Sequence, residues 1–184
     1  MEGKNIGVFP KLAVSLWVKP KSLSEDYSAL MNTDSWTTGS MHFQLLKDGQ
    51  IELALCNDGQ SDTSISLSTG EWANVVATVD TSERIAKVYV NGVLEMQIPL
   101  STGNPVHLDK FNLGSWAGNS RFLNGDMADV RIYDRVLTPV EIGAMTKERM
   151  SEDGLVASWN FENIREGVVS DVSGSNHNLV ITSP

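Results

Sequence analysis

The chain has 184 residues, of which 41% are hydrophobic and 20% are charged, a composition typical of one folded globular domain. Its net charge is −9 and it has no cluster of lysine and arginine, which argues against binding to a nucleic-acid backbone. Cys56 is the single cysteine, so no disulfide can form within the chain, and the lack of a run of about 18 apolar residues argues against membrane insertion.

Apolar residues alternate with polar ones along much of the chain, which predicts β-strands. The first strand is expected at residues 12–18, where every second residue is apolar. Residues 41–56 predict two strands that turn at Asp48–Gly49, and residues 85–100 predict a second hairpin that turns at Asn91–Gly92. The further predicted strands are residues 71–80, 107–115 and 126–134.

One helix is predicted, over "LTPVEIGAM" at residues 137–145. Thr138 is its expected N-cap, Pro139 occupies the first helical position, and Glu141 follows three residues after the cap. The polar, charged residues 147–153 are expected to form a connector. The pattern as a whole predicts an all-β fold with one short helix, either a sandwich or a barrel.

Several segments, in this order, resemble LamG-like jelly-roll domains of the concanavalin A-like lectin/glucanase superfamily. The matching segments are "VSLWVKP" (14–20), "EWANVVATVD" (71–80), "AKVYVNGVL" (86–94), "FNLGS" (111–115) and "FLNGDMADVRIYDRVLTPVEI" (122–142). The resemblance covers residues 12–142 and implies an antiparallel β-sandwich with jelly-roll topology. It does not identify a ligand, because this fold carries many functions.

The opening that is characteristic of this family stands at the other end of the chain. Residues 154–178, "GLVASWNFE" followed by "VVSDVSGSNHN", match the family's usual N-terminal strands and loop. We expect residues 154–184 to fold back onto residues 1–146 and complete one sandwich over residues 1–184, as in a circular permutation, because this buries exposed strand edges. Two alternatives are a tandem repeat cut out of phase and a segment that completes a neighbouring molecule.

The loop at residues 171–178 is a candidate calcium site, because carboxylate, amide and backbone oxygens are the ligands that calcium takes. The family resemblance implies a structural calcium closed by an acidic residue near the last strand, although Ala128 stands where some relatives have Asp. The alternative is an Asx-turn in which Asp171 binds backbone N–H groups. The candidate ligands are Asp171, Ser173, Asn176, Asn178, Asp129 and Asp126.

Two tryptophans in polar, glycine-containing loops are candidates for stacking against a sugar ring. Trp36 lies beside Asp34, and Trp116 lies near Asn119 and Arg121, whose polar groups would bind the hydroxyls. The alternative is that each tryptophan covers a hydrophobic cluster beneath its loop. The other three tryptophans lie on predicted strands within family motifs and are expected to pack in the core; they are Trp17, Trp72 and Trp159.

No paired-carboxylate strand motif of the sandwich glucanases occurs in the sequence, so the chain is not expected to be an enzyme. We therefore expect a non-catalytic carbohydrate-binding or adhesion module that binds a carbohydrate or a protein surface. The alternative is a structural or protein-interaction module of a larger surface, secreted or phage protein. The resemblance favours an extracellular or virion-associated location, and the start "MEGKNIGVFP" lacks the apolar region of a signal peptide.

Overall fold

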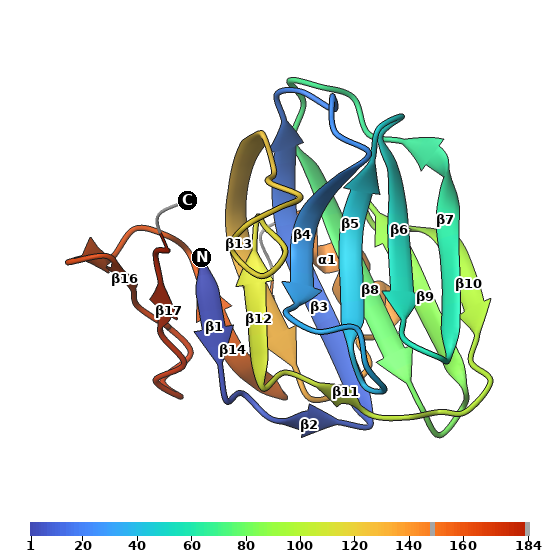
Figure 1. Cartoon of the computed structure of the whole chain (residues 1–184). Coiled ribbons are helices and arrows are strands. Elements are labelled where there is room, and N and C mark those ends of the chain that lie inside the picture. Colours follow the sequence, from blue (N-terminus) through green and yellow to red (C-terminus); the bar gives the residue numbers. More distant parts are fainter. Residues whose placement is uncertain (148–149, 183–184) are drawn as a thin grey trace.

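Two antiparallel sheets pack face to face in the computed structural model, which describes residues 1–147 and 150–182 (Figure 1). The nine-stranded sheet has the order β15 (Ile164–Arg165), β16 (Val168–Val169), β17 (Leu179–Val180), β1 (Glu2–Lys4), β12 (Lys110–Leu113), β4 (Tyr27–Thr33), β5 (Met41–Leu46), β6 (Gln50–Leu55) and β7 (Gly59–Ser66). The six-stranded sheet has the order β10 (Val93–Pro99), β9 (Ile85–Val90), β8 (Ala73–Asp80), β3 (Lys11–Pro20), β13 (Gly125–Tyr133) and β14 (Leu155–Trp159). β2 (Val8–Phe9) and β11 (Val106–His107) form a separate short pair. The prediction of an all-β jelly-roll sandwich is confirmed.

The core lies between the two sheets and follows the alternation in the sequence. Leu12, Val14 and Leu16 of β3 are buried in it, as are Phe43 of β5 and Leu53 of β6. Because successive side chains of a strand point to opposite faces, the residues between these positions face away from the core. The polar residues of β5 and β6 are thereby collected on the outer face of the nine-stranded sheet.

Both predicted hairpins are present, and their turns differ. At the β9–β10 turn Asn91 and Gly92 both have positive φ, 49° and 83°, as a type I′ turn requires. At the β5–β6 turn the left-handed position is Gly49, with φ of 86°, and its N–H donates to the carbonyl of Leu46 at 2.9 Å. A three-residue loop therefore connects β5 to β6.

The helix α1 (Pro139–Met145) has the predicted capping box. The Thr138 hydroxyl accepts from the backbone N–H of Glu141, while the Glu141 carboxylate accepts from the backbone N–H of Thr138. Hydrogen bonds from Arg135 are the main cause that lowers the pKa of Glu141 to about 2. Of the residues that the structure describes, none belongs to a helix long and apolar enough to cross a membrane.

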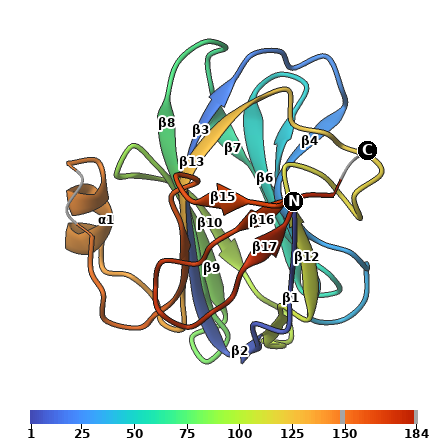
Figure 2. The ribbon, with the colours of Figure 1, turned by 90° about the vertical axis from the view of Figure 1, so that its left-hand side faces the viewer.

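The helix packs against part of the outer face of the six-stranded sheet (Figure 2). Ile142 and Met145 pack there against a small second core formed with Val76, Tyr89 and Tyr133. Among the described residues, no other helix covers this face.

The C-terminal segment contributes strands to both sheets of the same chain. β14 pairs with β13, and β17 pairs with β1 (Figure 1). Trp159 of β14 is fully buried. On β1, which pairs with β17, a Cβ atom added at Gly3 would lie only 2.3 Å from the ring of Phe111, so this strand packs closely against the core. The circular permutation itself stays a prediction, and positions 148–149 of the predicted connector lie outside the described residues.

The prediction that three tryptophans pack in the core is correct for Trp159 and wrong for Trp72. Trp72 precedes β8 and is 45% exposed, and Trp17 of β3 is only partly buried on the outer face of its sheet. The alternation explains the error, because both residues occupy positions opposite to the core-facing Leu16, Val18 and Val75.

Candidate functional site

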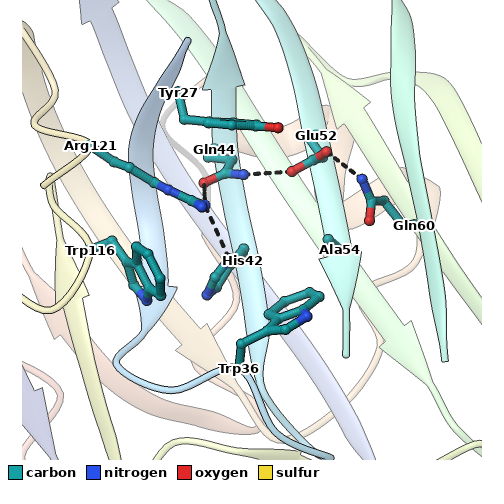
Figure 3. A pocket seen from close by; sticks show the side chains of 9 residues that line it. All are labelled: Tyr27, Trp36, His42, Gln44, Glu52, Ala54, Gln60, Trp116 and Arg121. Atoms are coloured by element: carbon teal, nitrogen blue, oxygen red, sulfur yellow. Dashed lines mark hydrogen bonds between the residues drawn. The ribbon is translucent and has the colours of Figure 1, made fainter. Parts of the chain in front are cut away.

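A cavity of about 280 Å³ lies on the outer face of the nine-stranded sheet (Figure 3). Its floor comes from β5, β6 and β7, where His42 pairs in register with Ala54, and Gln44 with Glu52. Its walls come from the start of β4 and from two loops, residues 34–40 and residues 114–121. The lining residues are Tyr27, Trp36, His42, Gln44, Glu52, Ala54, Gln60, Trp116 and Arg121.

Side-chain hydrogen bonds connect the polar groups of the floor. Gln44 is central: its Oε1 accepts from Arg121 Nη1 and from Asn32 Nδ2, both at 2.9 Å, and its Nε2 donates to Glu52 Oε1 at 2.5 Å. Gln60 Nε2 donates to the other Glu52 oxygen at 2.7 Å. These bonds stabilise the negative charge of Glu52, which is only 5% exposed, and fix each side chain in position.

His42 lies between the two loop tryptophans. Its ring centroid is 4.5 Å from that of Trp36 and 5.4 Å from that of Trp116. Burial, followed by the nearby positive charge of Arg121, lowers the pKa of His42 to about 4, so the imidazole is neutral at pH 7. Because Arg121 Nη1, 3.3 Å away, has only hydrogens to offer, Nδ1 of His42 is the acceptor and Nε2 carries the proton.

Arg121 is held between two aromatic rings. Its guanidinium carbon lies 4.5 Å from the ring centroid of Tyr27 and 4.4 Å from that of Trp116, which are cation–π distances (Figure 3). It forms no ion pair within the part of the chain that the structure describes, and Gln44 connects it by hydrogen bonds to the carboxylate of Glu52.

The backbone of the two loops sets these side chains in place. Trp116 and Ser120 exchange backbone hydrogen bonds around a tight turn in which Gly118 has φ of 70°, so Arg121 emerges beside Trp116. The carbonyl of Arg121 then accepts from the N–H of Ala29 at 2.8 Å, which ties the loop to β4. In the other loop, Ser40 and Thr37 are joined by hydrogen bonds of 2.8 and 3.1 Å next to Trp36.

The cavity thus offers aromatic surface beside fixed hydrogen-bonding groups. Trp36 is 44% exposed and Tyr27 is 36% exposed at its rim. Glu52 is the one carboxylate among the residues that line it, whereas hydrolysis of a glycosidic bond normally needs two. The arrangement is suited to binding a polar ring compound and lacks a catalytic pair.

Residues 5–143 match the family model of the concanavalin A-like lectin/glucanases superfamily. The chain belongs to this superfamily. No curated protein sequence matches the chain.

Solved structures share the superfamily fold at low sequence identity. A proposed carbohydrate-binding protein from Bacteroides ovatus is 17% identical, with a TM-score of 0.77 over 96% of this chain and 54% of that one. The CBM40 domain of the Ruminococcus gnavus IT-sialidase, bound to α2,3-sialyllactose, is 17% identical, with a TM-score of 0.64 over 77% and 84%. Domain 4 of AbnA, an extracellular arabinanase from Geobacillus stearothermophilus, in complex with arabinotriose, is 22% identical, with a TM-score of 0.56 over 76% and 68%. The chain spans about half the length of the Bacteroides ovatus protein.

Five ligand-binding residues were predicted from the sequence. Three of them line the same cavity of this chain, namely Trp36, Trp116 and Arg121. Asp34 lies elsewhere: it accepts from Asn112 Nδ2 and pairs with Lys110 at 2.7 Å. Asn119 does not line this cavity but another hollow, which shares Arg121 with it.

Sequence reasoning missed the polar residues of the cavity floor. Gln44, Glu52 and His42 lie on strands that were predicted correctly, at positions that face away from the core. The signal was present in the alternation, because two neighbouring strands each place polar residues on the same face. What distinguishes them from ordinary solvent-facing residues is the covering loops, which come from distant parts of the chain.

The Asp171 loop folds around its carboxylate. Asp171 Oδ1 accepts from the backbone N–H groups of Ser158 and Ser173 at 2.9 and 2.8 Å. Oδ2 accepts from the Ser173 hydroxyl at 2.9 Å and from the N–H of His177 at 3.0 Å. Burial raises the pKa of Asp171, but these hydrogen bonds outweigh it and lower the pKa below its usual value. The side chain of Asn178 also binds into the loop, through the N–H of Asp171.

Asp126 and Asp129 make no hydrogen bond with the described residues of this loop. Asp126 forms an ion pair with Lys21 at 2.5 Å, and Asp129 lines a hollow beside Trp17 and Trp72. The described residues contain no group of three or more His, Cys, Asp or Glu side chains placed to hold a metal ion. Calcium at this loop therefore stays a prediction from the sequence.

Proposed function

We propose that this chain is a non-catalytic module that binds carbohydrate in the cavity on the outer face of the nine-stranded sheet. The observation that carries the proposal is the half-exposed Trp36 beside the hydrogen-bonded group of Arg121, Gln44 and Glu52. An aromatic face and fixed polar groups match the two sides of a sugar, which has apolar C–H surfaces and hydroxyl groups at its rim. Superfamily relatives whose names describe carbohydrate binding support the same class of ligand.

In the proposed binding mode, a sugar ring stacks on Trp36 and directs its hydroxyls toward the cavity floor. Glu52 accepts two hydrogen bonds from amides, and a carboxylate has room for about four, so it can accept more from hydroxyls. The Gln60 amide, whose nitrogen binds Glu52, keeps its carbonyl oxygen for a hydroxyl donor. Since these side chains are already held in place, little conformational entropy is lost on binding.

The cavity carries one positive and one negative residue, Arg121 and Glu52, which are joined through Gln44. This balance favours a neutral glycan over a strongly anionic one. A single shallow site of this size binds weakly, so useful affinity would come from several copies on a larger protein, as in adhesion.

The proposal is tested on an array of microbial, plant and animal glycans with three proteins: wild type, Trp36→Ala and Trp72→Ala. Trp72 is the matched control, because it is exposed to the same degree and lies just before β8 of the other sheet. We expect wild type and Trp72→Ala to bind the same glycans, and Trp36→Ala to bind them about tenfold more weakly, as for an interface hot spot. Equal binding by all three proteins, or an array without bound glycan, would contradict the proposal.

A further inference from the structure

A second hollow, of about 270 Å³, lies on the outer face of the six-stranded sheet. Its lining residues are Trp17 of β3, Trp72 just before β8, and Ala128 and Asp129 of β13. It therefore lies on the opposite side of the sandwich from the cavity proposed to bind carbohydrate. The small core beneath α1 occupies another part of this face, formed by residues such as Val76 and Tyr89.

Asp129 owes its place in the hollow to an irregularity of β13. The pairing of β13 with β3 shifts register between Ala128 and Arg131, which is a β-bulge, and Asp129 within it has φ of 46°. A bulge redirects a side chain, and the left-handed region is uncommon for residues other than glycine. The Asp129 carboxylate accepts no hydrogen bond and forms no ion pair with any residue that the structure describes.

The hollow presents one carboxylate and two tryptophan side chains. Apart from the indole N–H groups, its lining offers one polar group, the Asp129 carboxylate, which can only accept when ionised. A sugar ring carries several hydroxyls, more than one carboxylate and two indole N–H groups can pair with, and a primary ammonium needs several acceptors for its three hydrogens. A quaternary ammonium needs neither: its charge is spread over apolar methyl groups, which are attracted to tryptophan faces and to a nearby carboxylate.

We propose that the hollow lined by Trp17, Trp72 and Asp129 binds a quaternary ammonium group. The net charge of −9 favours the approach of a cation at long range. This site is separate from the carbohydrate cavity and does not depend on the function proposed for it.

Two cations of the chain lie near the hollow without filling it. Lys19 follows Trp17 by two residues on the same face of β3, and Arg131 follows the bulge on β13. Over the described part of the chain, neither pairs with Asp129 and neither makes a cation–π contact with Trp17 or Trp72. Lys19 nevertheless opposes a bound cation by like-charge repulsion, whereas it would assist a hydroxyl-bearing ligand as a donor.

The test follows the indole N–H signals of the full chain by NMR while tetramethylammonium chloride is added at constant ionic strength. The neutral comparison is tert-butanol, which has a similar shape and no charge, and methylammonium tests a primary amine. We expect the signals of Trp17 and Trp72 to shift with tetramethylammonium, with Kd on the order of millimolar, and tert-butanol and methylammonium to bind at least about fivefold more weakly.

Four variants sharpen the result. Asp129→Asn removes the charge but keeps a residue type that tolerates the left-handed backbone, and it is expected to weaken tetramethylammonium binding about fivefold. Trp72→Ala is expected to abolish tetramethylammonium binding. Lys19→Gln is expected to strengthen binding about twofold, and Trp36→Ala, the matched control, to leave it unchanged. Equal binding of tert-butanol, tighter binding of methylammonium, weaker binding by Lys19→Gln, or no shift up to about 50 mM would each overturn the proposal.

Discussion

Two regions of the molecule are each built around a carboxylate whose two oxygens both accept hydrogen bonds. They differ in the number and type of the donors. In the Asp171 loop, four hydrogen bonds reach the carboxylate, three from backbone N–H groups and one from a hydroxyl two residues away. In the cavity of the nine-stranded sheet, Glu52 accepts two, both from side-chain amides that themselves line the cavity. Since a carboxylate accepts about four, the first is saturated and the second is not.

The difference shows that a polar loop and a polar pocket cannot be distinguished by residue type alone. Asp171 stabilises its own loop, whereas Glu52 keeps acceptor capacity beside the exposed Trp36. Replacement of residues in the Asp171 loop should therefore change stability, and replacement of residues in the cavity should mainly change binding.

The largest effect is expected where the Asp171 loop meets the core. Trp159 is fully buried, and its indole N–H donates to the carbonyl of His177 at 2.8 Å. Trp159→Ala should lower the free energy of unfolding by about 3–5 kcal/mol, as for other large-to-small core changes. Urea unfolding measures this loss, and a loss below about 1 kcal/mol would mean that the C-terminal segment is not part of the cooperative core.

Asp171→Ala should have the next largest effect. It leaves the N–H groups of Ser158, Ser173 and His177 without their partner, which should cost about 2–3 kcal/mol, while Asp171→Asn retains part of the network. Because the pKa of Asp171 is lower in the folded chain than in the unfolded one, this stabilisation is complete above pH 4 and is lost as the pH falls through the folded value. Urea unfolding at several pH values tests both statements.

Calcium provides a second test of the same loop. A bound ion would have to displace N–H donors that point at the Asp171 oxygens. From this geometry we expect about 5 mM calcium to change the Tm by no more than about 1–2 °C. A rise of several degrees that Asp171→Asn abolishes would instead establish the calcium site predicted from the sequence.

In the cavity, His42 should make stability depend on pH in a different range. The folded pKa is about 4 against an ordinary value of 6.5, so between these values the unfolded chain binds a proton that the folded chain does not. Stability is therefore full above about pH 6.5 and falls as the pH drops toward 4, by on the order of 1 kcal/mol once screening by solvent is allowed for. His42→Phe should remove this dependence between pH 7 and 5, and an unchanged slope would show that another group causes it.

The smallest effect is expected at Asp34, which the sequence associates with Trp36. In the structure its partners are Lys110, whose side chain is 51% exposed, and Asn112. Asp34→Asn should change the free energy of unfolding by less than about 1 kcal/mol and leave glycan affinity within about twofold. A loss of affinity as large as that of Trp36→Ala would place Asp34 in the binding site.

Features that depend on residues close together in the sequence could be predicted, whereas features that depend on distant segments could not. The Asn91–Gly92 turn and the capping box of α1 depend on neighbours within a few residues, so the sequence predicts them correctly. Trp36 and Trp116 were identifiable as loop tryptophans, but their meeting around His42 depends on strand register between distant segments. Trp72 was assigned to the core because it lies on a predicted strand within a family motif, whereas the alternation places it on the outer face of its sheet, where it is 45% exposed.

The most direct measurement is an NMR titration of the five tryptophan indole N–H signals with the glycan that binds best on the array. If carbohydrate occupies the cavity of the nine-stranded sheet, the signals of Trp36 and Trp116 shift together and saturate with one Kd, while those of Trp17, Trp72 and Trp159 stay in place. A glycan that shifts the signal of Trp72 and leaves that of Trp36 unchanged would contradict the account.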